Sequence, residues 1–215
     1  MDFKQIYSIC APYTMTSEDK MRALYNAVRY INNCAIEGSF VECGVYKGGS
    51  VMNMALTQQN YARLVHMYLY DTFEGMTAAT DHDITYHGHS AAHILKNPEK
   101  KCVCSEEDVR KHVFSTGYAP EFFHFVKGDV VQTLQKVIPP KIALLRIDTD
   151  WYESTKAILE HLFPQLVKGG VMILDDYDYW RGARKAVDEY FAANNITPSF
   201  IPMGPGISGV VFFNH

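Results

Sequence analysis

Two short apolar runs in this chain each end in a pair of aspartates. Runs of this length and composition predict buried strands, here over 141–148 and 171–176. Their carboxylates should lie together at the carboxyl edge of a parallel sheet, where open α/β sheets bind ligands. Clustered anions need a neutralising cation, and all-oxygen ligand sets favour a hard ion such as Mg²⁺. The sequence thus predicts a metal site among these acids: Asp148 and Asp150 after the first run, and Asp175 and Asp176 after the second.

Hydrophobic periods alternate between helix-like and strand-like from residue 17 onward, which is typical of βαβ units. Thr16 and Asp19 form a capping-box pattern before a first amphipathic helix, and Gly169-Gly170 is expected to end the helix after the fourth strand. Two β-rich pieces, 199–202 and 210–214, suit a hairpin. Further strands are expected over 40–44, 65–71 and 122–127, and further helices from Val51, from Ser105 and over 184–193. This α/β pattern, a mostly parallel sheet with helices on both faces and a C-terminal antiparallel hairpin, resembles the Rossmann-like class I methyltransferase fold.

Length and composition indicate one soluble domain. A chain of 215 residues can bury a substantial core, so we expect a single domain over 1–215, with an N-terminal helical segment over 1–38. The net charge of −4, without a Lys/Arg cluster, argues against nucleic acid as a partner. Apolar runs are only strand-sized and no secretion signal is recognisable, so we expect a cytoplasmic protein without membrane association. Association into a homodimer or a higher homo-oligomer stays open.

A glycine-rich segment, residues 42–50, follows one predicted strand and opens a helix. Its glycines would let the backbone approach a ligand, although their spacing is not that of a dinucleotide fingerprint and a tight turn is the simpler interpretation of such a loop alone. Acids also end the next two strands: Asp71 is suited to ribose hydroxyls, and Asp129 to an adenine amine. Together with Glu42 near a sulfonium, these signals favour S-adenosylmethionine as cofactor.

Five blocks of the chain resemble the macrocin O-methyltransferase family: residues 12–16, 40–50, 69–76, 144–155 and 174–177. The resemblance implies an S-adenosylmethionine- and Mg²⁺-dependent enzyme that methylates a sugar hydroxyl on a small-molecule or glycoside substrate. It implies metal ligation by Asp148, Asp175 and Asp176, with Asp150 as general base. It further implies cofactor contacts by Met15, Glu42, Gly44, Val45, Ser50, Asp71, Phe73, Asp129 and Asp148. Separately, Tyr13 and Tyr177 are candidates for contact with the acceptor.

Asp150 has two interpretations. If the chain stays extended after Asp148, the two side chains point the same way, and Asp150 could take a proton from a bound hydroxyl. Asp150 also precedes a predicted helix, where aspartate is a favoured N-cap. We favour the base because of the family resemblance.

The long segment over 72–105 has little periodicity, and loops of this length are often lids or binding loops. We expect it to cover the acceptor, although a mobile insertion without a role would have the same composition. Its cysteines and histidines could be zinc ligands, but their spacing is not that of a zinc finger. With five cysteines in all, an odd count, reduced thiols are expected.

Three other functions remain as alternatives. A catechol-type O-methyltransferase would use a similar fold and a vicinal aromatic diol. A non-catalytic S-adenosylmethionine-binding protein would have no need for clustered acids, which destabilise the free protein. A nicotinamide-dependent oxidoreductase would need the dinucleotide glycines that are missing here.

Overall fold

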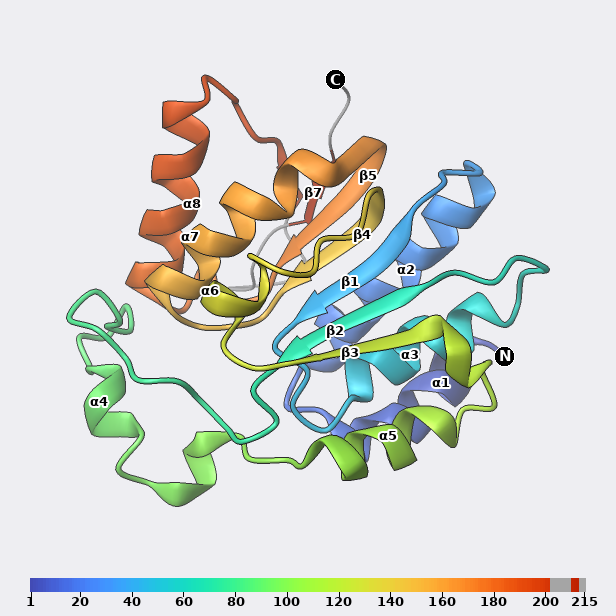
Figure 1. Ribbon diagram of the computed structural model, residues 1–215, viewed down its shortest axis with the longest axis horizontal. Helices are drawn as coiled ribbons and strands as arrows, with labels where there is room; N and C mark the ends of the chain where they lie inside the picture. The colour runs from blue at the N-terminus through green and yellow to red at the C-terminus, as the bar shows by residue number, and fades with distance from the viewer. Residues whose placement is uncertain (202–209, 213–215) are drawn as a thin grey trace.

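One continuous sheet forms the centre of the protein (Figure 1). The computed structural model describes residues 1–201 and 210–212, and within them the sheet has the strand order β3-β2-β1-β4-β5-β7-β6. Five strands are parallel, and β7 pairs antiparallel with both β5 and β6. The predicted fold class is confirmed. The strands are β1 (Ser39–Cys43), β2 (Met67–Asp71), β3 (Phe123–Lys127), β4 (Ile142–Ile147), β5 (Leu166–Leu174), β6 (Phe200–Ile201) and β7 (Val210–Phe212).

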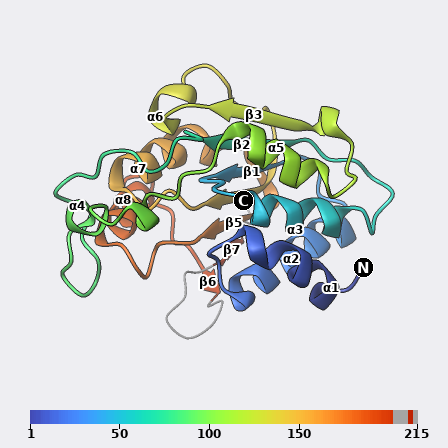
Figure 2. The same cartoon turned by 90° about the horizontal axis from the view of Figure 1, so that it is seen from below.

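Helices cover both faces of this sheet (Figures 1 and 2). One face carries α1 (Phe3–Cys10), α2 (Glu18–Asn33), α3 (Gly49–Gln58) and α5 (Glu106–Phe114), and the other carries α6 (Val130–Thr133), α7 (Tyr152–His161) and α8 (Arg181–Ala193). Successive strand residues point to opposite faces, so Phe40 and Leu144 join the first core while Val41 and Leu145 join the second. Strands buried on both faces explain the nearly unbroken apolar runs in the sequence.

The chain order reverses beside β1, which has β2 on one side and β4 on the other. At such a switch point the loops after neighbouring strands diverge and leave a crevice at the carboxyl edge. The short helix α4 (Ala91–Ile94) lies on the side toward which the arrowheads of the parallel strands point (Figure 1). The predicted acids and the segment over 72–105 therefore share one end of the molecule.

Two local predictions are wrong. The side chain of Ser17, rather than Thr16, caps α2 by accepting from the Lys20 N–H. Gly169 and Gly170 do not end a helix, because α7 already ends at His161 and both glycines lie within β5. There the register against β4 shifts, and Gly169 adopts a φ of +78° in the irregular stretch. A positive φ suits either a helix end or a strand irregularity, so the glycines alone could not decide between them.

The predicted hairpin is present as a strand pair, with Phe200 opposite Val211. Its expected turn over 204–206 lies outside the described residues. Within the described ranges, no helix has both the length and the apolar composition that crossing a bilayer requires.

Candidate functional site

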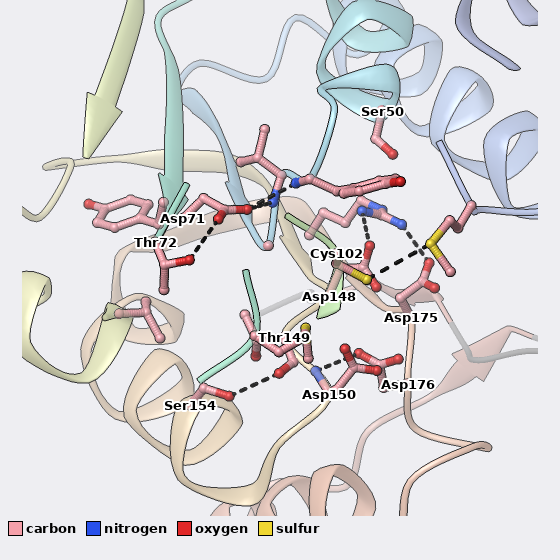
Figure 3. Close-up of a pocket in the computed structure, with 18 of the residues that line it drawn as sticks. Ser50, Asp71, Thr72, Cys102, Asp148, Thr149, Asp150, Ser154, Asp175 and Asp176 are labelled. Atoms are coloured by element: carbon pink, nitrogen blue, oxygen red, sulfur yellow. Dashed lines mark hydrogen bonds and ion pairs between the residues drawn. The ribbon is translucent and has the colours of Figure 1, made fainter. Parts of the chain in front are cut away.

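A cavity of about 490 Å³ opens at the carboxyl ends of the parallel strands (Figure 3). Most of the residues predicted for the site line it: Met15, Gly44, Val45, Ser50, Asp71, Asp129, Asp148, Asp150, Asp175 and Asp176. Glu42, Phe73, Tyr13 and Tyr177 are not among its lining residues. Asp71 lies toward one end of the cavity, and the aspartates that follow β4 and β5 lie toward the other.

Three aspartates meet at the second end. One carboxylate oxygen from each of Asp148, Asp175 and Asp176 lies within 4.8 Å of the others. Burial, together with the neighbouring carboxylates, holds the pKa values of Asp148 and Asp176 well above their ordinary range despite nearby cations. Two of the three acids are therefore poorly neutralised by the protein itself. This all-oxygen donor set fits a hard divalent cation such as Mg²⁺.

A buried arginine, Arg146, links this cluster to β1. Its guanidinium donates to Asp148 Oδ2 and Asp175 Oδ1, each at 2.7 Å. It also donates to Thr16 Oγ1 at 3.0 Å and pairs with Glu42, its direct neighbour across β1 and β4. Arg146 thus contacts three carboxylates at once, and the residue pattern did not predict this role.

Glu42 lies behind the cavity rather than in its wall. Its Oε1 accepts from Arg146, whereas its buried Oε2 has no hydrogen-bond partner in the described part of the chain. Burial raises the pKa of Glu42 to about 7, although Arg146 works in the opposite direction. Any influence of Glu42 on a ligand in the cavity would pass through Arg146.

A second cation, Lys20 in the first turn of α2, reaches the cluster from the opposite side of Asp175. Its Nζ lies 2.8 Å from Asp175 Oδ2 and 2.8 Å from the Asp175 carbonyl oxygen. Burial alone would raise the pKa of Asp175, but Arg146 and Lys20 outweigh it and lower that pKa below its ordinary value. Asp175 is therefore the well-neutralised member of the three.

Asp150 lines the cavity, but the backbone there is not extended, contrary to the condition under which its side chain would follow that of Asp148. Its φ of +64° turns the chain, and its N–H donates to Asp176 Oδ2 at 3.0 Å. The Asp150 Oδ1 accepts from Trp180 Nε1 at 2.5 Å. Burial, and then the charge of Asp148, raises the pKa of Asp150 to about 7. Such a carboxylate is a candidate proton acceptor near neutral pH.

Helix capping is not the role of Asp150. The N-cap residue of α7 is Trp151, and the Tyr152 N–H donates to Asp83 Oδ1 at 2.8 Å. Asp83 comes from the segment over 72–105 and is fully buried. Its other oxygen accepts from both the N–H and the hydroxyl of Thr80.

The glycine-rich loop packs directly against the metal half of the site. Gly44 has a φ of +87°, and a Cβ there would lie 1.8 Å from the carbonyl oxygen of Asp148. Asp71 stabilises the loop through hydrogen bonds, because its Oδ2 accepts from the N–H groups of Val45 at 2.6 Å and Tyr46 at 2.9 Å. Its Oδ1 accepts from the Phe73 N–H at 2.8 Å. Asp71 thus orders the loop in addition to facing the cavity.

The two tyrosines predicted to contact the acceptor do not line this cavity. The Tyr13 ring packs on His112, with centroids 4.4 Å apart. The Tyr177 hydroxyl donates to Asp188 Oδ1 at 2.7 Å, and its ring stacks on Phe200. The tyrosine that this loop does present to the cavity is Tyr179, which is half exposed. Tyr179 was not predicted from the sequence, and its place at the cavity depends on the conformation of this loop.

The segment over 72–105 is attached to the body of the protein at its middle. Thr85 forms a bridge with Trp180, and the Arg181 N–H donates to the Ile84 carbonyl oxygen. Further along, Cys102 lines the cavity, and its Sγ lies 3.9 Å from Met15 Sδ. Within the described residues, the three aspartates form the only group with metal-ligand spacing, so the histidines and cysteines of this segment are not gathered into a zinc site.

Comparison with known proteins gives consistent matches. A family model for macrocin-O-methyltransferase (TylF) matches residues 9–205. A demethyldecarbamoylnovobiocin O-methyltransferase of Streptomyces niveus is 28% identical over 192 residues, which cover 88% of this chain and 71% of that protein. An 8-demethyl-8-(2,3-dimethoxy-alpha-L-rhamnosyl)-tetracenomycin-C 4'-O-methyltransferase of Streptomyces olivaceus is 30% identical over 185 residues, 83% of this chain and 67% of that protein. The structure of the O-methyltransferase NovP has a TM-score of 0.81 and 26% identity, covering 94% of this chain and 81% of its own.

Proposed function

The chain belongs to the macrocin O-methyltransferase family and is an S-adenosylmethionine-dependent O-methyltransferase, and we propose that it methylates a sugar hydroxyl with the help of Mg²⁺. The observation that carries this proposal is the meeting of Asp148, Asp175 and Asp176 beside the cavity. Relatives named for sugar methylation, such as the tetracenomycin rhamnosyl 4'-O-methyltransferase, support a sugar acceptor over an aromatic diol.

The donor would occupy the end of the cavity formed by the glycine-rich loop. Gly44, Val45 and Ser50 line the cavity, and the backbone at Gly44 has no room for a side chain. Asp71 and Asp129 also face the cavity, at the ends of β2 and β3. Asp71 would accept hydrogen bonds from the ribose hydroxyls, and Asp129 would accept one from the adenine amine. Ser50, at the start of α3, would hold the amino-acid end of the donor.

The acceptor would bind at the opposite end, against the aspartates. Asp148, Asp175 and Asp176 would hold Mg²⁺, which supplies Lewis-acid stabilisation of negative charge on a substrate oxygen. Asp150 would take the proton of the reacting hydroxyl, because its carboxylate lines the cavity next to Asp176. Trp180 would hold Asp150 in place through the hydrogen bond to Oδ1. Positioning of the hydroxyl near the methyl group contributes a large further share of the acceleration.

The test pairs turnover with donor binding. Purified protein would be incubated with S-adenosylmethionine labelled in the methyl group, Mg²⁺ and a panel of nucleotide-linked and natural-product sugars. Label should pass to a sugar, and chelation of Mg²⁺ should stop the transfer. Asp150→Asn should abolish turnover, a drop on the order of 10²–10⁴ for a lost general base, while calorimetry shows unchanged S-adenosylmethionine affinity. Transfer to catechols in preference to sugars, or a wild-type rate in Asp150→Asn, would contradict the proposal.

A further inference from the structure

Lys20 occupies one of the oxygens through which Asp175 would bind an ion. Asp175 Oδ1 accepts from Arg146 at 2.7 Å and Oδ2 accepts from Lys20 at 2.8 Å. The ammonium also holds the carbonyl oxygen of the same residue. Both cations thus contact Asp175, and Arg146 contacts Asp148 as well. A divalent ion that binds Asp175 must therefore replace or share one of these contacts.

The two cations differ in how readily they could give way. Arg146 is 2% exposed and is bound by three carboxylates, one in β1 and one directly after each of β4 and β5, so its position is determined by the sheet. Lys20 is a flexible side chain on a helix, 18% exposed, and it lines the cavity. The ammonium of a lysine is a point charge on a rotatable stem, whereas a guanidinium makes fixed, forked contacts. Lys20 is thus the contact that can yield.

We propose that Lys20 competes with the divalent cation for Asp175 and thereby weakens ion binding in the absence of substrate. The inference rests on the proposed function, since it concerns the same aspartates. A positive charge within a few ångströms of the site repels a doubly charged ion, and even with water-like screening this corresponds to an affinity difference on the order of tenfold. In the ion-free protein, Lys20 would reduce the electrostatic repulsion between Asp175 and the other two aspartates. It would move aside when the ion binds.

The position of Lys20 also connects the ion to the donor end. Met15 and Thr16, a few residues before it, line the same cavity, and Thr16 accepts from Arg146. Lys20 therefore lies just beyond the segment in which Met15 is a predicted donor contact.

The experiment measures Mn²⁺ binding, by the loss of the free-ion electron paramagnetic resonance signal, with Mg²⁺ as competitor. It uses the full chain without donor, at pH 8 and constant ionic strength. Lys20→Met should bind Mn²⁺ about tenfold more tightly than wild type, and Lys20→Gln should behave similarly. Lys20→Arg, which keeps the charge, should stay close to wild type. The matched control Lys168→Met removes an exposed lysine near the other end of β5 and should not change the affinity.

Each result separates this inference from the proposed function. Equal or weaker Mn²⁺ binding by Lys20→Met and Lys20→Gln overturns the competition by Lys20 but leaves Mg²⁺-dependent methylation standing. Loss of binding in Asp176→Asn locates the measured ion at the aspartate cluster. If neither wild type nor Lys20→Met binds Mn²⁺, both this inference and the metal part of the proposed function fail. Thermal unfolding of each variant checks that the fold is retained.

Discussion

Replacing Gly44 by alanine tests how closely the donor loop and the metal site are packed. Gly44 and Gly88 have nearly the same φ, +87° and +86°, so alanine at either position meets the same backbone strain. At Gly88 a Cβ has nothing within 4 Å, whereas at Gly44 it would lie 1.8 Å from the Asp148 carbonyl oxygen. The pair of variants therefore separates the steric clash from the φ strain.

The expected magnitudes differ strongly. At Gly88 the left-handed conformation costs about 1–2 kcal/mol, and the lower entropy of the unfolded chain offsets about 0.4–1 kcal/mol of it, which leaves a loss of about 1 kcal/mol. At Gly44 the Cβ must also move from 1.8 Å to beyond 3.0 Å from the carbonyl oxygen. This movement separates β1 from β4 where the Asp148 N–H donates to the Cys43 carbonyl oxygen. Adding buried unpaired backbone groups, each costing about 1–3 kcal/mol, gives a total loss of about 4 kcal/mol or more.

Urea unfolding followed by circular dichroism measures both free energies of unfolding. Mn²⁺ binding provides the second readout, because the clash displaces Asp148 itself. Gly44→Ala should lose ion and S-adenosylmethionine binding, and Gly88→Ala should keep both. If Gly44→Ala is destabilised by no more than about 1 kcal/mol beyond Gly88→Ala and still binds the ion, the close approach described for the loop is incorrect.

Other residues of the site give further predictions. Arg146→Met should lower the free energy of unfolding, measured with urea at pH 8, by about 3–5 kcal/mol, because it leaves buried carboxylates unpaired. Adding Glu42→Gln to this variant should recover part of the loss. If the free-energy changes of the two substitutions simply add, the pairing of Glu42 with Arg146 is contradicted. The pKa values of Glu42 and Asp150 are raised to about 7 in each case. Between about pH 4 and 7 the folded state therefore holds more protons than the unfolded state. The free energy of unfolding of the ion-free protein should consequently fall as pH rises through this window. Mg²⁺ should accordingly raise the melting temperature more at pH 8 than at pH 5, and an equal shift would refute this. Asp83→Ala should cost about 1–3 kcal/mol by removing the partner of the α7 N-terminus, and unchanged thermal stability would show that this contact is dispensable.

The sequence is most informative where a function depends on neighbours along the chain. An apolar run followed by an acid places a carboxylate at a strand end, so the convergence of Asp148, Asp175 and Asp176 could be expected from the residue pattern alone. The pairing of Glu42 with Arg146 could not, because it depends on the register between β1 and β4, which are 104 residues apart at this contact. Likewise the approach of Lys20 depends on how α2 packs against the sheet.

Local backbone conformation accounts for the remaining differences. The positive φ of Asp150 is uncommon for a residue with a side chain, and the residue pattern does not predict it. The same limit applies to Tyr177, a predicted acceptor contact that does not line the cavity, whereas Tyr179 does. Two tyrosines two residues apart share a direction only in an extended chain, and this loop contains a turn in which the Tyr179 N–H donates to the Asp176 carbonyl oxygen.

The anchoring of Asp83 at the start of α7 bears on how this enzyme could be re-engineered. The parts of the segment over 72–105 before and after Asp83 also contact each other, because the Met76 N–H donates to the Lys101 carbonyl oxygen at 2.9 Å. Libraries that vary this segment should therefore keep both the Met76–Lys101 hydrogen bond and the contact of Asp83 with the Tyr152 N–H. Exchanging the whole segment over 72–105 for that of a homologue would remove Asp83, which accepts from the Tyr152 N–H at the start of α7. A chimera therefore needs an acid at the position of Asp83.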